Sequence, residues 1–296
     1  MMTKLLSGIL AAVVTPFDAA GEVDLKGIKK QVDRLAAAGI HGIVTTGTTG
    51  EFPALTLDEH KRVIKAYVDA VDGRLPVVAG FGRNSTREAI EMAQYSEKVG
   101  ATACMIVPPF YDPLTFKALY KFYEDVCGSI SIPVMYYNLP HATGVHLTAD
   151  QFRSLSEING FNFVKDTSGN AKELADLLTN PPSKLTVFIG WDTLTFFALS
   201  HGAEAGVWGV ASLLPKECVE FWNTISVEKN LEKAREQWKL LWEVSDFLES
   251  VNYPAGIKAG LEIIGEPAGT VRPPTLPIEK EEYDKLAEIL SRRKYK

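Results

Sequence analysis

Short runs of apolar, β-branched and aromatic residues recur along this chain, and most are followed by a longer segment whose apolar positions have helical spacing. Eight such runs are present, at residues 9–14, 43–46, 77–79, 103–107, 134–137, 161–164, 187–189 and 206–210. They lie about thirty residues apart on average, which is the length of one strand–helix unit. Each run therefore predicts a buried strand.

The segments between the runs carry helix start and stop signals. The segment 25–38 ends before Gly39, a typical helix stop. Three pairs have the spacing of a capping box at a helix start: Thr56 with Glu59, Ser85 with Glu88, and Thr148 with Gln151. Eight strands alternating with helices predict an α/β fold, the (β/α)8 TIM barrel, whose usual size is about 250 residues. Because strand patterns stop before residue 215, we expect a catalytic barrel over residues 1–225 and a C-terminal helical extension over residues 226–296.

Composition and charge narrow the class of partner. The chain has 296 residues, 46% of them hydrophobic and 23% charged, which is typical of a globular protein with a large core. The net charge is −6 and the basic residues are scattered, so we expect a small-molecule partner, with no nucleic acid and no membrane. Three distant cysteines (Cys104, Cys127 and Cys218) favour reduced thiols and a cytoplasmic location.

The first apolar run has an alternative interpretation. Lys4 followed by residues 5–14 loosely resembles the charged and apolar regions of a signal peptide. Gly8 interrupts this run, however, and Pro16-Phe17-Asp18 resembles a turn rather than a cleavage site. The pattern therefore favours a strand.

One lysine stands at the end of a predicted strand. The run 161–164 is followed by Lys165, and a Thr-Ser-Gly sequence then breaks the pattern. In TIM barrels catalytic groups lie at the carboxyl ends of strands, where partial desolvation favours a neutral, nucleophilic amine. Lys165 is thus a candidate for imine chemistry, and the alternative is a side chain that extends to solvent. Alternation along a strand turns Asp166 outward, away from the amine.

Two other strand ends carry hydroxyl groups. The sequence Thr46-Gly47-Thr48-Thr49-Gly50-Glu51 follows the second strand, and its glycines and hydroxyls suit a small carboxylate. The alternative is a glycine turn in which Thr48 and Thr49 satisfy local amides. Tyr136 and Tyr137 end the fifth strand, and because they face opposite sides, at most one of them is catalytic.

Two motifs that could suggest a nucleotide cofactor or a metal ion are incomplete. Gly80-Phe81-Gly82 lacks the third glycine of a dinucleotide-binding motif. His141 and His146 have no cysteine or acidic partner at metal-ligand spacing. We therefore expect neither a nucleotide cofactor nor a metal ion.

Taken together, the motifs resemble the dihydrodipicolinate synthase and N-acetylneuraminate lyase family of class I, Schiff-base aldolases. The resemblance covers nearly the whole chain. It rests on Gly47-Thr48-Thr49-Gly50-Glu51, Pro109-Phe110-Tyr111, Tyr137-Asn138-Leu139-Pro140, Val164-Lys165-Asp166-Thr167-Ser168-Gly169 and Val271-Arg272-Pro273-Pro274. The family has a (β/α)8 barrel with a C-terminal helical extension and usually forms tetramers of tight dimers, so a homodimer or homotetramer is expected.

The resemblance also implies roles for the candidate residues. Lys165 would form a covalent imine with the keto group of pyruvate or another 2-keto acid, with no separate cofactor. Thr48 and Thr49 would hold the carboxylate, and Tyr137 would shuttle protons. Tyr111 matches a tyrosine that reaches across the dimer interface into the neighbouring site, and the alternative is a tyrosine that packs locally.

Further substrate contacts are expected at the last two strands. These are Gly190, Asp192 and Trp208. Trp208 is bulky where the lyases are small, so it would shorten a pocket for a long sugar chain. Neuraminate lyases also carry an acid at the position of Thr193 and a serine at that of Thr48.

One departure bears on the second substrate. The synthases carry an arginine after the tyrosine motif, which binds the carboxylate of that substrate, and Ala142 occupies this position here. Arg83 and Arg87 are the only evident replacements, and Arg87 is predicted to lie on a helix. The sequence 140–144 looks more like that of 2-keto-3-deoxy acid aldolases.

We therefore expect a pyruvate-dependent aldolase that cleaves or forms a 2-keto acid. The favoured substrate is a 2-keto-3-deoxy (sugar) acid, which would give pyruvate and an aldehyde. The alternative is 4-hydroxy-tetrahydrodipicolinate (dihydrodipicolinate) synthase, which condenses pyruvate with aspartate semialdehyde. A more distant alternative is a non-catalytic barrel that binds keto acids.

Overall fold

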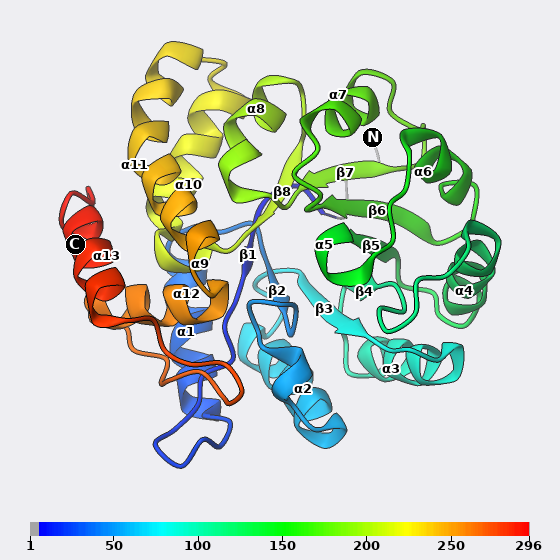
Figure 1. Cartoon of the computed structure of the whole chain (residues 1–296), viewed down its shortest axis with the longest axis horizontal. Helices are drawn as coiled ribbons and strands as arrows, with labels where there is room; N and C mark the ends of the chain where they lie inside the picture. Colours follow the sequence, from blue (N-terminus) through cyan, green and yellow to red (C-terminus); the bar gives the residue numbers. More distant parts are fainter. Residues whose placement is uncertain (1–5, 296) are drawn as a thin grey trace.

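The computed structural model describes residues 6–295, in which eight parallel strands close into a barrel in sequence order (Figure 1). The strands are β1 (Gly8–Ala12), β2 (Gly42–Thr45), β3 (Val77–Gly82), β4 (Ala103–Val107), β5 (Val134–Asn138), β6 (Phe161–Asp166), β7 (Thr186–Ile189) and β8 (Ala205–Trp208). Every strand overlaps one predicted run, so the predicted barrel is confirmed. Residues 8–12 of the leader-like run form β1, and Lys4 and Leu5 lie outside the described residues.

Helices and short helical turns connect the strands. They are α1 (Leu25–Ala37), η1 (Phe52–Ala54), α2 (Leu57–Val71), α3 (Thr86–Lys98), α4 (Phe116–Gly128), α5 (Pro140–Thr143), α6 (Ala149–Leu155), α7 (Ala171–Thr179), η2 (Asp192–Leu194) and α8 (Thr195–Ser200). Thr56 and Thr148 form complete capping boxes, as predicted, and the Ser85 hydroxyl accepts a hydrogen bond from the Glu88 amide. These caps satisfy amides at the helix starts that have no partner within the helix.

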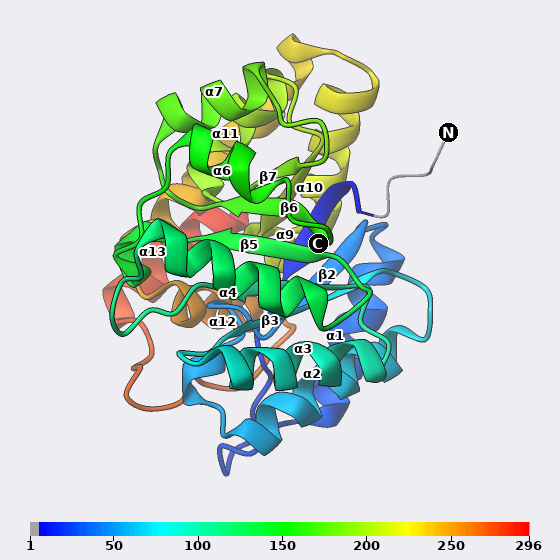
Figure 2. The same ribbon diagram turned by 90° about the vertical axis from the view of Figure 1, so that its right-hand side faces the viewer.

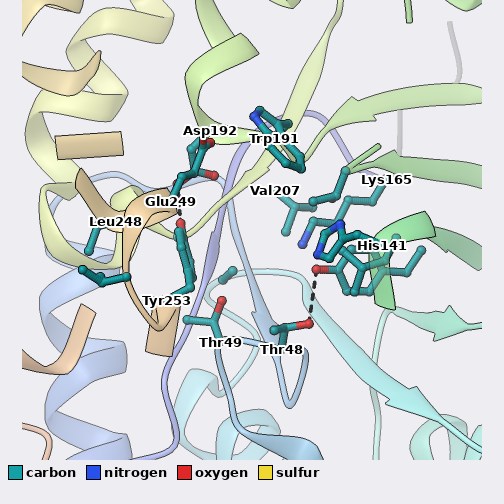
Figure 3. Close-up of a pocket in the computed structure, with 17 residues that line it drawn as sticks. Thr48, Thr49, His141, Lys165, Trp191, Asp192, Val207, Leu248, Glu249 and Tyr253 are labelled. Carbon is teal, nitrogen blue, oxygen red and sulfur yellow. Dashed lines mark hydrogen bonds between the residues drawn. The ribbon is translucent and has the colours of Figure 1, made fainter. Parts of the chain in front are cut away.

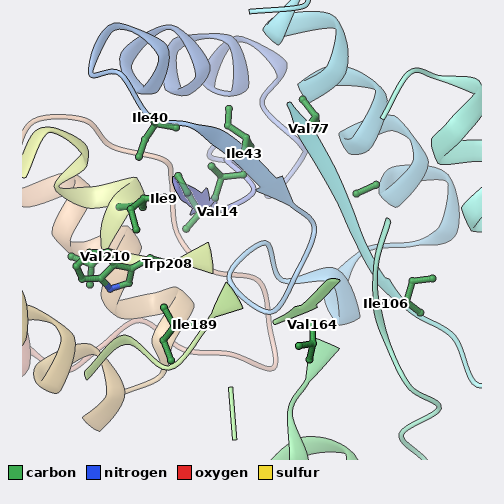
Figure 4. Close-up of a cluster of buried hydrophobic side chains, with 14 of the residues drawn as sticks. Ile9, Val14, Ile40, Ile43, Val77, Ile106, Val164, Ile189, Trp208 and Val210 are labelled. Carbon is green, nitrogen blue, oxygen red and sulfur yellow. The ribbon is translucent and has the colours of Figure 1, made fainter. Parts of the chain in front are cut away.

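Alternation along the strands separates two apolar layers. Inside the barrel lie side chains that include Leu10, Val44, Val78, Met105, Met135, Tyr137, Phe163, Phe188 and Val207. Their neighbours point outward and pack against the helices, among them Ile9, Ile43, Val77, Ile106, Val164, Ile189 and Trp208 (Figure 4). Because successive side chains point to opposite faces of a strand, the position of one residue fixes the direction of the next.

The described chain after β8 forms helices and connecting loops, with no further strand up to residue 295. It contains α9 (Val210–Leu213), α10 (Pro215–Trp222), the π-helical turn η3 (Asn223–Val227), α11 (Leu231–Ser250), α12 (Tyr253–Ile263) and α13 (Lys280–Ser291). Of these helices, α9 and α10 pack against β1, α11 packs against η2, and α13 packs on α11 and α12 (Figures 1 and 2). The extension therefore borders the carboxyl ends of β7 and β8.

The structure also bears on membrane-spanning helices and on disulfide bonds. None of the helices within residues 6–295 combines the length and hydrophobicity that a bilayer span requires. Cys104, Cys127 and Cys218 are all buried and form no disulfide.

Candidate active site

A cavity of about 260 Å³ opens at the carboxyl ends of the barrel strands (Figure 3). Its lining comes from six strand ends and from the helical extension. The residues are Ala12, Thr48, Thr49, Tyr137, Leu139, His141, Lys165, Thr167, Gly190, Trp191, Asp192, Val207, Gly209, Leu248, Glu249, Val251 and Tyr253. The cavity thus contains Lys165, Tyr137, Thr48, Thr49, Gly190 and Asp192, six of the eight residues that were predicted from the sequence.

Lys165 projects into this cavity from β6. The strand extends through Asp166, two residues beyond the predicted run, so Lys165 lies within the strand and alternation determines its direction. Its side chain is only 5% exposed, and the Nζ atom lies 4.0 Å from the centre of the Tyr137 ring. Asp166 points outward and accepts a hydrogen bond from the Asn138 amide group, as alternation predicted.

Tyr137 and Thr48 bring two hydroxyl groups to the same cavity. The Tyr137 hydroxyl lies 3.4 Å from Oγ1 of Thr48, and either one can donate the hydrogen bond. Tyr136 lies outside the barrel, against the aromatic rings of Tyr123 and Phe152. Burial raises the pKa of Tyr136 well above its usual range. Of the two tyrosines, only Tyr137 can therefore touch a ligand near Lys165.

The loop after β2 is held in a conformation that favours particular residues. Thr46 and Glu51 have positive φ angles of 50° and 56°, which non-glycine residues seldom adopt. A Cβ atom on Gly50 would lie 2.8 Å from the Thr46 backbone, so only glycine fits there. The Gly50 carbonyl also accepts a hydrogen bond of 2.6 Å from the Thr15 hydroxyl. The loop therefore presents Thr48 and Thr49 from a fixed backbone.

Gly190 leaves room for the lysine side chain. A Cβ atom at this position would lie 2.5 Å from Cε and 2.7 Å from Cγ of Lys165. It would also lie 2.4 Å from Oγ1 of Thr167, so no larger residue fits without moving the lysine. The glycine thus acts by making space beside the amine.

An acidic wall lines the cavity where η2 meets the extension, and it consists of Asp192 and Glu249. Asp192 is buried and accepts a hydrogen bond from the Tyr253 hydroxyl, which reaches it from α12 (Figure 3). Burial raises the pKa of Asp192 to about 7, and the Tyr253 hydrogen bond partly opposes that rise. Burial also raises the pKa of Glu249, whose carboxylate accepts hydrogen bonds from the Thr193 amide and hydroxyl, both at 2.9 Å.

The expectation that Trp208 binds substrate is wrong. Its ring is 1% exposed and packs outside the barrel, with ring centroids 6.1 Å from Phe221 and 5.9 Å from Trp238. Strand alternation explains the error, because Val207 takes the inward position on β8 and lines the cavity. Trp208 therefore does not shorten the substrate pocket.

Tyr111 lies away from this cavity. It is 89% exposed and is not among the lining residues. Asn84 fixes the backbone here, because its Oδ1 atom accepts hydrogen bonds from the amides of Phe110 and Tyr111. A role for Tyr111 in the site of a neighbouring subunit stays a prediction.

The candidate arginines do not reach the cavity. Arg83 lies on the outside of the barrel mouth, where Nη2 is 3.3 Å from Nδ1 of His60. Arg87 lies on α3, as predicted, and its side chain is 86% exposed. Among residues 6–295, no arginine lines the cavity.

Several lining residues were not identified from the sequence. Trp191 follows directly after Gly190, and its ring lies edge-on to His141 with the centroids 6.0 Å apart. Glu249 and Tyr253 come from the extension, more than eighty residues after Lys165. A position after a strand end could have suggested Trp191, whereas no local pattern marks the two extension residues.

Comparisons with known proteins show the family of this chain. The chain matches the Dihydrodipicolinate synthetase family over residues 5–293. A curated relative from Methanocaldococcus jannaschii, named 4-hydroxy-tetrahydrodipicolinate synthase, is 36% identical over 97% of this chain and 98% of its own length.

Solved structures of the same family also resemble this chain. The dihydrodipicolinate synthase of Acinetobacter baumannii in complex with pyruvate has a TM-score of 0.92 and 30% identity, with 97% of this chain and 98% of that chain covered. A prophage protein of the dihydrodipicolinic acid synthase family from E. coli K12, also in complex with pyruvate, has a TM-score of 0.91 and 27% identity, with coverage of 96% and 97%. This chain is a carbon–carbon lyase that belongs to the dihydrodipicolinate synthetase family.

Proposed function

We propose that Lys165 forms an imine with pyruvate, and that the protein makes or breaks a carbon–carbon bond at the carbon atom adjacent to the imine carbon. One observation carries the proposal: the buried Lys165 amine shares a small cavity with the hydroxyl groups of Tyr137 and Thr48. A primary amine, a proton donor and acceptor, and a carboxylate-binding loop are the groups that this chemistry needs.

The first steps follow from the chemistry of a neutral amine. The Lys165 nitrogen bonds to the keto carbon, and the keto oxygen takes a proton to give a carbinolamine. Loss of the hydroxyl group as water then leaves a protonated imine. Tyr137 is placed to give and take these protons, while the hydroxyl groups of Thr48 and Thr49 hold the carboxylate.

The protonated imine then acts as an electron sink. Loss of a proton from the adjacent methyl group gives a neutral enamine, which avoids a free carbanion. In condensation, the enamine carbon bonds to the aldehyde carbon and the aldehyde oxygen takes a proton. In cleavage, a hydroxyl group loses its proton, the carbon–carbon bond breaks and the aldehyde leaves. The enamine that remains then takes a proton on its terminal carbon, which gives the protonated imine of pyruvate. Hydrolysis of the imine then restores the Lys165 amine.

For the second substrate, the relatives favour aspartate semialdehyde. Proteins named 4-hydroxy-tetrahydrodipicolinate synthase are 36% identical to this chain in Methanocaldococcus jannaschii and in Archaeoglobus fulgidus. Their names support the condensation of pyruvate with aspartate semialdehyde, which was the alternative from the sequence, over the cleavage of a sugar acid. Condensation is therefore our first candidate reaction.

One feature of the cavity favours a second candidate, the cleavage of a 2-keto-3-deoxy acid. Ala142 offers no charge to a second carboxylate, and within the described residues no arginine lines the cavity. The acidic wall of Asp192 and Glu249 instead offers acceptors for hydroxyl groups. An uncharged hydroxyaldehyde carries no carboxylate, so it needs no positively charged partner in the cavity.

Reduction with borohydride tests the imine. Incubation of the protein with pyruvate and then borohydride should add a reduced pyruvate group to Lys165, which peptide mass spectrometry would locate. Lys165→Ala should take up no label, while Lys258→Met removes another buried lysine and should keep it. An unlabelled Lys165 at saturating pyruvate would refute imine formation.

The choice of aldehyde needs a parallel assay. Condensation of pyruvate with aspartate semialdehyde is measured beside pyruvate release from a panel of 2-keto-3-deoxy acids. Efficient condensation without cleavage supports the first candidate. Cleavage with little condensation supports the second.

A further inference from the structure

A second buried lysine lies behind the carboxylate-binding loop, outside the cavity that contains Lys165. Lys258 of α12 forms an ion pair with Glu51, with Nζ 2.7 Å from Oε1 and side chains only 3% and 4% exposed. Within residues 6–295, Oε1 has no hydrogen-bond partner of good geometry, so the positive charge of the Lys258 ammonium is what offsets the burial of this oxygen. A buried pair of this kind is costly unless both charges are well placed, which makes it an unusual feature to find beside a binding loop.

Each partner is fixed by further contacts. The Lys258 ammonium donates a hydrogen bond of 2.8 Å to the Thr270 carbonyl and lies 4.1 Å from the centre of the Phe17 ring. Oε2 of Glu51 accepts a hydrogen bond of 2.9 Å from the Arg272 amide. The extension therefore contacts both oxygens of the Glu51 carboxylate.

Glu51 belongs to the loop that presents Thr48. Its amide donates a hydrogen bond of 3.0 Å to the Thr48 carbonyl, and its φ angle of 56° is one that a non-glycine residue seldom adopts. A positive φ angle costs a non-glycine residue conformational free energy, and it persists only where surrounding contacts hold the backbone in place. Here the Glu51 side chain supplies such contacts, in addition to the hydrogen bond between Thr15 and Gly50.

We infer that Lys258 and Glu51 are positioning residues, through which the helical extension holds Thr48 and Thr49 in the geometry that binds the carboxylate of a 2-keto acid. The inference rests on the proposed function, because it takes that loop as the carboxylate site. Neither residue lines the cavity, so both act through the loop backbone. Without the Lys258 charge, the buried Glu51 carboxylate would be unpaired, and it would become more stable by moving into solvent. This movement would change the conformation of the loop.

The test measures pyruvate affinity separately from reactivity. Lys258→Met removes the charge and keeps a side chain of similar length. The pyruvate concentration that gives half-maximal borohydride labelling of Lys165 should rise about tenfold, which corresponds to about 1.4 kcal/mol of lost binding free energy. Labelling at saturating pyruvate should reach the wild-type extent, because Lys165 itself is unchanged. An unchanged half-saturating concentration would overturn the inference.

A matched control comes from another part of the barrel. The Arg153 side chain of α6 pairs with Asp176 of α7 at 2.8 Å, so Arg153→Met removes a partly buried ion pair that does not involve the Glu51 carboxylate. Its half-saturating pyruvate concentration should stay within about twofold of wild type when measured at a temperature where it is folded. A rise equal to that of Lys258→Met would show a general effect of lost stability, and would overturn the inference.

A double variant covers the case in which Lys258→Met does not fold. Glu51→Gln combined with Lys258→Met leaves no unpaired buried charge, and neutral replacement of both partners is often tolerated. The double variant should fold and still need more pyruvate than wild type. Wild-type affinity in this variant would overturn the inference.

A neutral analogue adds a readout specific to the carboxylate. Methyl pyruvate has the same keto group and no negative charge, so Lys258→Met should weaken labelling by pyruvate more than labelling by the ester. Equal weakening would show that the loop does not act on the carboxylate. A wild-type protein that takes no label from pyruvate sinks the proposed function itself, whereas normal wild-type labelling with unaltered variants sinks only the positioning role.

Discussion

Tyr137 contacts two other residues of the candidate site through different parts of its side chain. Its ring lies against the Lys165 amine, and its hydroxyl group points to Thr48. The ring keeps the amine partly shielded, while the hydroxyl group can move protons. Because these two contributions come from different atoms, removal of the oxygen alone can separate them.

We predict that Tyr137→Phe lowers turnover by about 10²-fold or more, which is the usual scale of general acid–base catalysis, because the ring stays and the proton carrier is lost. Steady-state pyruvate release or consumption measures the effect. Tyr136→Phe is the control, since that hydroxyl group lies outside the barrel, and its turnover should stay near wild type. Near-normal turnover in Tyr137→Phe would refute the assigned role.

Asp192 makes stability depend on pH. Burial raises its pKa to about 7 from the ordinary 3.8, and the Tyr253 hydroxyl partly opposes the rise. The folded state therefore holds this proton more tightly than the unfolded chain does. The contribution of Asp192 to the free energy of unfolding then falls as pH rises from about 4, and its loss is complete above about pH 7.

Asp192→Asn should remove this dependence. We predict that the free energy of unfolding of the variant minus that of wild type increases between pH 5 and pH 8, by at most about 3 kcal/mol at about 1.4 kcal/mol per pH unit. Urea unfolding of both proteins at several pH values gives the difference. A difference that stays constant or falls over this range would show that Asp192 is ionised in the folded state throughout.

At the scale of elements, strand alternation decides which side chains meet. It turns Lys165 and Tyr137 into the barrel, and it turns Tyr136 and Trp208 out against the helices. Trp208 fills the space between β8, α10 and α11, where it packs with Phe221 and Trp238. Its contribution is therefore to stability.

We predict that Trp208→Leu lowers the free energy of unfolding by about 2 kcal/mol or more, because it leaves a cavity in the helical layer. The pyruvate concentration for half-maximal labelling of Lys165 should be unchanged. Val207→Phe gives the contrast, because this neighbour faces the cavity and a larger ring would obstruct pyruvate. If Trp208→Leu altered pyruvate affinity as much as Val207→Phe, the packing assignment would fail.

The same scale shows what the sequence could and could not predict. A period of two residues correctly placed Asp166 opposite Lys165 and Tyr136 opposite Tyr137, because a strand fixes the direction of each side chain from its neighbour. The resemblance then selected Tyr137 as the residue of the site. Trp208 was misplaced because the apolar run 206–210 does not by itself show which alternate side chains face inward. Glu249 and Tyr253 reach the cavity only through the packing of α11 and α12, and no local pattern encodes that contact.

At the scale of the whole molecule, the loop that carries Thr48 and Thr49 is held by distant segments. Glu51 is held by Lys258 and Arg272, more than two hundred residues later in the chain. The extension thus lines the cavity through Tyr253 and contacts the loop that carries Thr48 and Thr49 through Lys258. A helical addition to the barrel therefore contributes both to the cavity wall and to the support of this loop.

Tyr111 raises the question of assembly. Its ring is 89% exposed, whereas the adjacent Phe110 packs on Phe52 with the ring centroids 6.4 Å apart. A large aromatic side chain that is presented on an ordered backbone suits a protein interface. We propose that the protein forms a homodimer or homotetramer in which Tyr111 enters the site of a neighbouring subunit.

Mixing two inactive variants tests this arrangement. Lys165→Ala lacks the imine-forming amine, and Tyr111→Phe lacks the donated hydroxyl group. If Tyr111 serves the neighbouring site, a mixed dimer contains one site with both Lys165 and Tyr111. Equal amounts, unfolded together and refolded, should recover about a quarter of wild-type activity, because half of the randomly formed dimers are mixed and each has one complete site of two. If Tyr111 instead serves its own subunit, no mixed dimer contains a complete site, and activity should remain at the level of the separate variants.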